Sequence, residues 1–134
     1  MVYVLDGAGI PSVPLHQGVD TTLFHPGPPR RPFGDRFVVF SGGKLAFRKG
    51  QDLVVAAFRR FHRRHPDALL VTCWQNSWPD LAGLIVAGRA AHAPEPRSDH
   101  GIDVEGWMAR MGLAEGSYMD VDFVSNERMP AILR

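Results

Sequence analysis

Three short apolar runs, separated by segments of helical pattern, constrain the fold more than any other feature of the sequence. The runs lie at residues 37–41, 69–74 and 118–124, and turn-forming residues bound them. Continuous apolar runs of this length are typical of strands covered on both faces. Strands that alternate with helices predict a parallel sheet with right-handed crossovers, and we expect the second strand in the middle. The sequence therefore predicts an α/β fold, half of a three-layer, Rossmann-like domain.

Residues 1–36 differ in composition from the rest of the chain. Prolines recur through this segment and forbid a helix over most of it; they are Pro11, Pro14, Pro26, Pro28, Pro29 and Pro32. We interpret residues 1–36 as an interdomain linker remnant and residues 37–134 as the first half of a domain that is truncated. The first strand would then lack a neighbour on one side, and an unpaired apolar edge predicts that the isolated chain is either marginally stable or self-associates.

The segments between the apolar runs carry helix signals. After Gly50, one apolar stripe is spaced as on a helix face; it comprises Leu53, Val54, Ala57, Phe58 and Phe61. Three further helix starts are predicted at capping residues; these are Ser77, Asp103 and Asn126. Pro79 and Pro130 fit the first turns of their helices, and Gly112 is a C-terminal stop. Residues 90–100 are predicted to form a surface loop.

Composition narrows the classes of function. The formal net charge is +1, which provides no strong overall field for nucleic acid or an anionic membrane. The single Cys73 excludes an intrachain disulfide, fits a reducing cytoplasm, and is predicted to be a buried structural thiol. No apolar stretch approaches the ~20 residues of a membrane-spanning helix, and residues 1–9 do not resemble a signal peptide. We therefore expect a cytoplasmic protein with no transmembrane segment and no nucleic-acid partner.

The segment that carries chemistry lies between the first predicted strand and the first predicted helix. Doubly wound sheets bind ligands at this end of their strands. Gly42 and Gly43 let the backbone approach a ligand, and a helix N-terminus offers amides to an anion. Three cations accompany them, namely Lys44, Arg48 and Lys49. The pattern predicts a diphosphate site, with a glycine turn flanked by solvated lysines as the alternative.

Other chemical motifs are absent from the sequence. The segment lacks the helix-opening Lys-Ser/Thr of a Walker loop and the Gly-x-Gly-x-x-Gly of NAD-binding proteins. The six histidines show no metal-ligand spacing, so we expect neither a metal nor another cofactor. Asp120 and Asp122 stand at strand spacing on one face, but they lack the partners of a glycosidase pair.

The same segment resembles the donor-domain signature of the retaining GT-B glycosyltransferases of the large family four. That signature is Gly-Arg, a short spacer, then Lys-Gly and an apolar helix. Gly43 and Lys44 match its first part with lysine substituted, and Lys49 and Gly50 match its second part. Residues 13–20, with Phe24-His25-Pro26 after them, resemble the family's linker, written Pro-x-Gly-Val-Asp followed by Phe-x-Pro.

The resemblance covers residues 11–74 well and 118–134 loosely. It implies transfer of a sugar, with retention, from a nucleoside-diphosphate sugar to an acceptor that these motifs do not specify. Lys44 and Lys49 would be catalytic because their charges stabilise the departing diphosphate without a metal. The donor-binding residues implied are Gly42, Gly43, Arg48, Val124, Ser125 and Asn126, the last three on the nucleobase side.

Several residues depart from the family pattern. The second strand ends in residues 73–76 without the family's Gly-x-Gly, and Lys44 lacks the bidentate fork of arginine. Residues 127–134 do not supply the family's Glu-x7-Glu element, so we expect the isolated piece to be inactive. Trp74 and Trp78 either line the donor cleft or pack beneath the long loop. The alternative function is a non-catalytic phosphate-binding or protein-interaction module with half a Rossmann-like fold.

Overall fold

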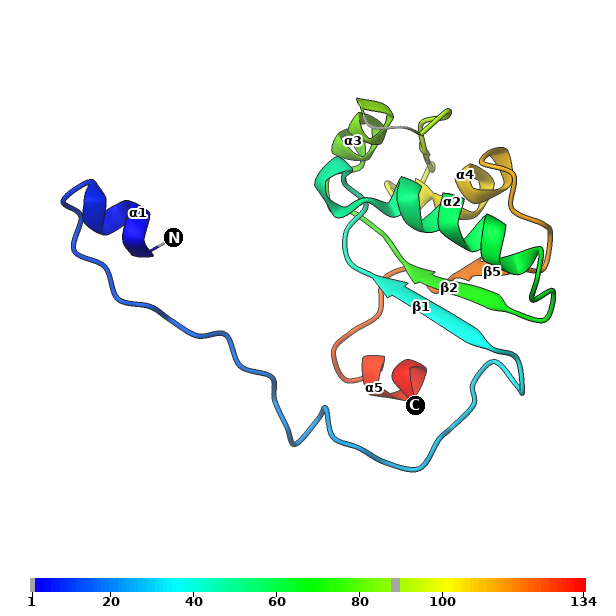
Figure 1. Ribbon diagram of the computed structural model, residues 1–134, viewed down its shortest axis with the longest axis horizontal. Helices are drawn as coiled ribbons and strands as arrows, with labels where there is room; N and C mark the ends of the chain where they lie inside the picture. The colour runs from blue at the N-terminus through cyan, green and yellow to red at the C-terminus, as the bar shows by residue number, and fades with distance from the viewer. Residues whose placement is uncertain (1, 88–89) are drawn as a thin grey trace.

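A computed structural model of the chain describes residues 2–87 and 90–134 and shows a mixed α/β fold (Figure 1). Its central sheet has the order β1-β2-β5. The strands are β1 (Val38–Gly42), β2 (Leu69–Cys73) and β5 (Tyr118–Asp120). Both pairings are parallel, with Val38 opposite Leu69 and Leu70 opposite Tyr118. The predicted parallel sheet with the second strand in the middle is therefore confirmed.

The third strand is shorter than predicted. It ends at Asp120, whereas the apolar run continues to Val124. The amide of Val121 still donates to the carbonyl of Thr72 at 2.8 Å. Asp122 then adopts a φ of 58°, in the left-handed region, which turns the chain away from the sheet.

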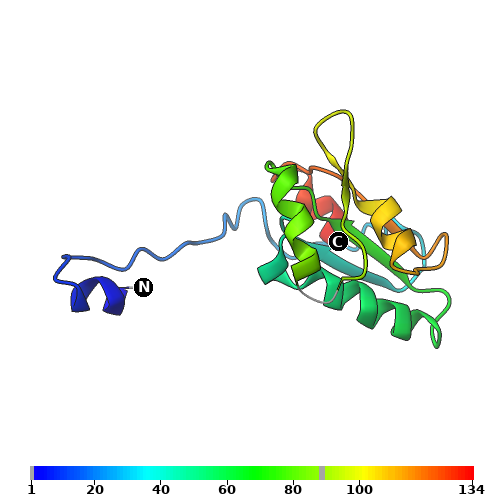
Figure 2. The same cartoon turned by 90° about the horizontal axis from the view of Figure 1, so that it is seen from above.

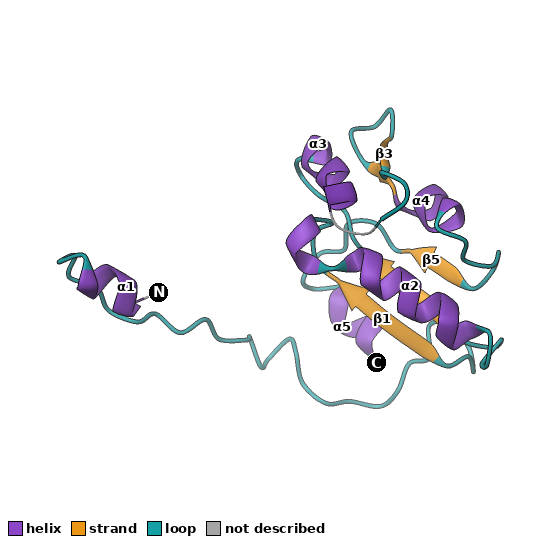
Figure 3. Ribbon diagram, turned by 45° about the horizontal axis from the view of Figure 1, so that its top comes forward, coloured by secondary structure: helices purple, strands orange, loops and turns teal. Residues whose placement is uncertain are grey.

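Helices cover both faces of the sheet (Figure 3). On one face lie α2 (Gln51–His62), α3 (Pro79–Ala82) and α4 (Val104–Arg110), with the 3-10 turns η1 (Phe47–Lys49) and η2 (Gly83–Ala87) beside them. The opposite face carries α5 (Met129–Leu133). A crossing of the chain from one face to the other is typical of doubly wound sheets. The architecture is compatible with a Rossmann-like half domain.

The long segment before β1 is mostly extended and runs away from the sheet (Figure 2). It begins with α1 (Val2–Gly7), a short helix that the sequence analysis did not predict. Arg36 ties the end of this segment to the sheet, because its guanidinium donates to the carbonyls of Asp67, Ala68 and Gly116 at 3.1, 2.8 and 2.8 Å. Part of the loop predicted at residues 90–100 is instead a strand, since β3 (Glu95–Pro96) pairs antiparallel with β4 (Ile102–Asp103).

The hydrophobic core lies between the sheet and the helices of one face. Its largest fully buried side chains are Trp74, Trp107, Leu45, Leu70, Ile85, Ile102 and Met108. Trp74 and Trp107 meet edge to face with ring centroids 6.1 Å apart. Each buried indole N–H has a partner, as burial of a polar group requires: Trp74 Nε1 donates to Ser41 Oγ at 3.1 Å and Trp107 Nε1 donates to the carbonyl of His92 at 2.7 Å.

The apolar stripe predicted for α2 does not coincide with the face of the helix that is buried. Gln51, Val55 and Phe58 are buried, whereas Leu53 is 57% exposed and Ala57 is exposed. Gln51 turns inward because its side chain bonds to the preceding loop, and positions four and seven residues later then face the core. The predicted stripe is therefore wrong for Leu53 and Ala57.

The predicted helix ends are confirmed at some positions and wrong at others. Asp103 caps α4, because its Oδ1 accepts from the amide of Gly106 at 3.0 Å. Gly112 adopts a φ of 84° after α4, and Pro79 and Pro130 lie in the first turns of α3 and α5. The caps predicted at Ser77 and Asn126 are wrong: α3 and α5 instead follow Trp78 and Arg128, and neither of these provides a side-chain cap bond.

Replacing the Asp103 cap tests how strongly this local signal stabilises the fold. We expect Asp103→Ala to lower the free energy of unfolding by about 1 kcal/mol, because the Gly106 amide loses its acceptor. Asp103→Asn keeps an acceptor at the same place and should retain most of that stability. Urea unfolding of the two variants measures the difference, and equal losses would contradict the capping role.

The edge of β1 away from β2 pairs with no other strand in the described part of the chain. Phe37 and Val39 line an apolar cavity beside this edge with the α2 residues Val54, Ala57, Phe58 and Phe61. We expect the chain to self-associate through this edge, and Phe37→Lys to weaken the association because a charged edge resists pairing. Phe123→Lys is the control, since both phenylalanines are 63% exposed. Sedimentation at rising concentration tests this, and a monomer throughout would contradict it.

Candidate functional site

The candidate site is the loop that joins the carboxyl end of β1 to α2. Gly42 is the last residue of β1, and Gly43 adopts a φ of 111°, which a side chain would strain. The loop stays beside β2: the amide of Gly43 donates to the carbonyl of Cys73 at 3.1 Å, and that of Leu45 to Trp74 at 3.0 Å. The fully buried side chain of Leu45 anchors the loop in the core. The loop is therefore a fixed part of the sheet edge.

Two buried side-chain amides hold this loop in its conformation. Gln51 Nε2 donates to the carbonyl of Lys44 at 2.9 Å, and its Oε1 accepts from the amide of Ala46 at 3.4 Å. Asn76 Nδ2 donates to the carbonyl of Leu45 at 2.8 Å, and its Oδ1 accepts from the amide of Trp78 at 3.0 Å. The sequence analysis missed both roles. The available signal was a polar residue at the end of an apolar run or at the start of a helix.

The three predicted cations all project from this loop and are exposed. Lys44 lies over the indole of Trp78, with its Nζ 4.8 Å from the ring centroid. Arg48 and Lys49 belong to η1, and Gly50, with a φ of 69°, links η1 to α2. Several loop amides are already bonded within the protein, and in the first turn of α2 the amide of Leu53 donates to the carbonyl of Gly50 at 3.0 Å. Anion binding here would therefore depend mainly on the cationic side chains.

The predicted nucleobase residues lie in the turn between β5 and α5. Val124 is half-buried, while Ser125 and Asn126 are exposed. The carbonyl of Ser125 accepts from the amides of Arg128 and Met129, both at 3.1 Å. This turn and the loop after β1 both leave the carboxyl edge of the sheet, as Figure 1 shows. The structure thus places the two predicted groups at the same end of the sheet.

Asp120 is a structural carboxylate at this edge. It accepts hydrogen bonds from Thr72 Oγ1 at 2.7 Å, from Gln75 Nε2 at 3.0 Å and from the amide of Trp74 at 3.3 Å. The sequence predicted that Asp122 shares a strand face with Asp120. This prediction is wrong, because Asp122 lies beyond the strand and has a positive φ. The carboxylate of Asp120 is therefore occupied in joining β2 to β5.

Arg97 closes a small polar cavity of about 170 Å³ beside Asp120. Its guanidinium bonds to Asp122 at 3.0 Å and also to Asp99. The bond from Arg97 lowers the pKa of Asp99 to about 2. The sequence analysis did not identify this cluster, because it joins a hairpin to a turn far along the chain.

Cys73 and the two tryptophans near the site have distinct environments. Cys73 is half-buried, and its Sγ donates to the carbonyl of Asp122 at 3.1 Å. Burial raises the pKa of the Cys73 thiol, which fits the predicted structural role better than that of a nucleophile. Trp74 packs in the core, whereas Trp78 is 59% exposed beside Lys44. Trp78 alone of these two is available to a ligand.

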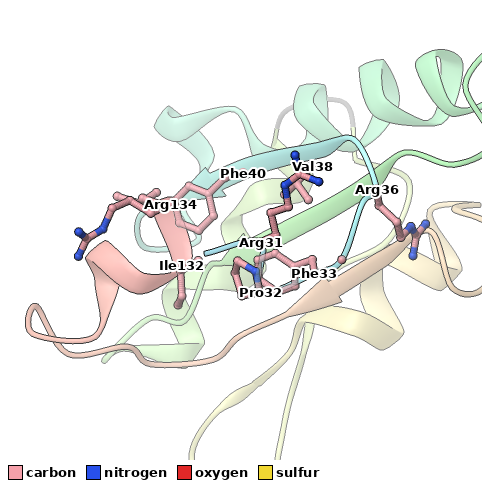
Figure 4. A pocket seen from close by; sticks show the side chains of 10 residues that line it. Arg31, Pro32, Phe33, Arg36, Val38, Phe40, Ile132 and Arg134 are labelled. Carbon is pink, nitrogen blue, oxygen red and sulfur yellow. The ribbon is translucent and has the colours of Figure 1, made fainter. Parts of the chain in front are cut away.

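A further cavity of about 270 Å³ lies beneath β1, on the face that carries α5 (Figure 4). Val38 and Phe40 of β1, Phe33 of the preceding segment and Ile132 of α5 contribute to its wall. It contains none of the predicted site residues in its lining. This cavity therefore adds nothing to the candidate site at the carboxyl edge.

The described residues contain no group of three or more histidine, cysteine or acidic side chains arranged to hold a metal. The same part of the chain has no helix that is long and apolar enough to cross a membrane. No family model, curated protein or solved structure matches the chain. Any functional assignment must therefore be argued from the residues and their geometry.

Proposed function

We propose that this chain is the donor-binding part of a retaining glycosyltransferase and that the loop after β1 holds the diphosphate of a nucleotide sugar. One observation carries the proposal: Gly43, three exposed cations and the start of a twelve-residue helix gather at the carboxyl end of a parallel strand. This edge is where doubly wound sheets bind ligands. Helix amides and cations together favour an anion.

The proposed chemistry is electrostatic. When the bond between the anomeric carbon and the diphosphate oxygen breaks, negative charge grows on the departing diphosphate. Lys49 lies at the entrance to α2, where its charge adds to the positive end of the helix dipole. Lys44 approaches from the strand side. Groups that bind the charge more tightly in the transition state than in the ground state accelerate the reaction.

Lys44 must leave the Trp78 ring to reach a diphosphate. A cation–π contact at an exposed site contributes roughly 0.5–1 kcal/mol. A hydrogen bond between charged groups contributes roughly 1.5–3 kcal/mol. The diphosphate therefore competes successfully with the Trp78 ring for Lys44. In the absence of ligand, the contact with Trp78 keeps the Lys44 side chain near the site.

The competing function is a non-catalytic phosphate-binding or protein-interaction module. The apolar cavity beside the free edge of β1 favours a protein partner, since Phe37, Val54 and Phe61 line it without polar neighbours. Binding of a nucleoside diphosphate would distinguish the enzyme from a protein-interaction module but not from a phosphate-binding module. Release of diphosphate from a nucleotide sugar by a protein that joins this chain to an acceptor-binding part would favour the enzyme, and binding without release by that protein would favour the module.

Calorimetric titration with uridine, guanosine and adenosine diphosphates tests the proposal. We expect one of them to bind in the presence of a chelator, and we expect affinity to fall as salt rises, because exposed charges are screened. The matching nucleosides lack the diphosphate and serve as controls. The proposal is wrong if none of the three diphosphates binds, or if a nucleoside binds as tightly as its diphosphate.

A further inference from the structure

The segment from Trp78 to Val86 exposes an apolar row where a surface helix would normally expose polar groups. It continues from α3 into the 3-10 turn η2, and side chains three residues apart eclipse in a 3-10 helix. Ala82 and Ile85 form the buried row. Trp78, Leu81 and Leu84 form an exposed row, each about half exposed or more.

A second element extends this apolar row. The turn η1 lies against η2 and contributes Phe47, which is also about half exposed. We call these four side chains the Trp78 patch: Phe47, Trp78, Leu81 and Leu84. Their isolated exposure would be ordinary, but an exposed apolar group gathered from two elements marks an interaction site.

Cations border the Trp78 patch. Lys44 lies over the Trp78 ring, and Arg48 and Lys49 follow Phe47 in η1. Asp80 is the exposed acidic residue of α3. It lies on a third side of this segment, together with Val86, and not in the exposed row of Trp78, Leu81 and Leu84. The net charge of +1 gave no sign of this arrangement, because acidic residues elsewhere in the chain offset the cations of residues 44–49.

We propose that the Trp78 patch docks on a membrane surface that carries anionic phospholipid. Exposed Trp, Phe and Leu beside Lys and Arg is the composition of surfaces that lie in the headgroup region. The indole of Trp78 has the amphipathic shape that favours this region, and Lys44, whose Nζ lies 4.8 Å from the centroid of that ring, can move its charge from the ring to the phosphates. A protein partner would need no such border of cations, so charge complementarity favours the lipid surface.

Trp78 supplies its own reporter for this proposal. The chain has three tryptophans, and Trp74 and Trp107 are fully buried while Trp78 is 59% exposed. Vesicles of phosphatidylcholine with phosphatidylglycerol should shift the tryptophan emission of the full chain to the blue. Vesicles of phosphatidylcholine alone should do so much less. Trp78→Phe should remove the shift while co-sedimentation with the vesicles persists.

Matched variants separate the patch from the rest of the surface. Leu81→Gln with Leu84→Gln should weaken co-sedimentation by about tenfold or more, because two apolar side chains no longer enter the interface. Leu133→Gln is the control, since Leu133 is 52% exposed on α5, across the sheet. Arg48→Gln should weaken binding about fivefold. Arg63→Gln, an exposed position just after α2, should change it less.

The outcomes distinguish this proposal from the proposed enzymatic function. The vesicles contain no nucleotide, so a failure here does not affect the diphosphate titration, and the reverse also holds. Absence of co-sedimentation with anionic vesicles at low salt overturns the proposal. Self-association of the chain that the Leu81 and Leu84 substitutions abolish would also overturn it, because the patch would then be a protein interface.

Discussion

Trp107→Ala is expected to lower the free energy of unfolding by about 3–5 kcal/mol. Trp107 is fully buried on α4 and packs edge to face against Trp74. Its removal leaves a cavity in the core and removes the donor to the carbonyl of His92. Domains of this size have a total stability of roughly 5–15 kcal/mol, so a large fraction of the variant should be unfolded at modest urea concentrations.

Trp78→Ala is the matched control for this prediction. It deletes the same side chain from an exposed position, so we expect a loss of less than about 1 kcal/mol. Urea unfolding monitored by circular dichroism compares the two variants. Losses of equal size would contradict the placement of the core between the sheet and α4.

If the proposed function is right, Lys49→Ala is expected to reduce the turnover of glycosyl transfer roughly ten- to a hundredfold in a protein that joins this chain to an acceptor-binding part. The variant would lose the charged hydrogen bond that Lys49 is proposed to make with the diphosphate at the entrance to α2. If charge develops mainly as the diphosphate departs, kcat should fall more than donor binding weakens. Steady-state kinetics with the nucleotide sugar varied separates these two quantities.

The neighbouring cations provide the controls for Lys49. Lys44→Ala should have a smaller effect than Lys49→Ala, because Lys44 lies over Trp78 and must move to reach the diphosphate. Arg48→Ala should have a smaller effect still, since adjacent positions of η1 point in different directions. Full activity in a folded Lys49→Ala variant would remove the diphosphate assignment and most of the mechanistic proposal.

Much of the sheet could be predicted because its signals are local. The apolar runs around Val39 and Leu70 predicted strands without any knowledge of the neighbouring strands. Asp103 caps α4, as its place in the sequence indicated. The phase of α2 could not be predicted in this way. It depends on Gln51, whose inward orientation follows from a bond to the loop carbonyl of Lys44.

The candidate site shows the same division between local and distant signals. The position of Lys44, Arg48 and Lys49 after β1 followed from strand and helix boundaries alone. The contact of Lys44 with Trp78 joins residues far apart in the chain, and no local pattern indicates it. The left-handed backbone of Asp122 was equally hidden, because Asp122 stands within an apolar run that itself predicts a strand.

Amide NMR titration with uridine, guanosine and adenosine diphosphates tests the central claim most directly. The diphosphate is expected to shift the amide signals of Lys44, Lys49 and Gln51, which surround the start of α2. The corresponding nucleoside should leave these signals unchanged. Shifts confined to the cavity that Arg97 and Asp122 line, or no shifts with any of the three diphosphates, would contradict a diphosphate site at the end of β1.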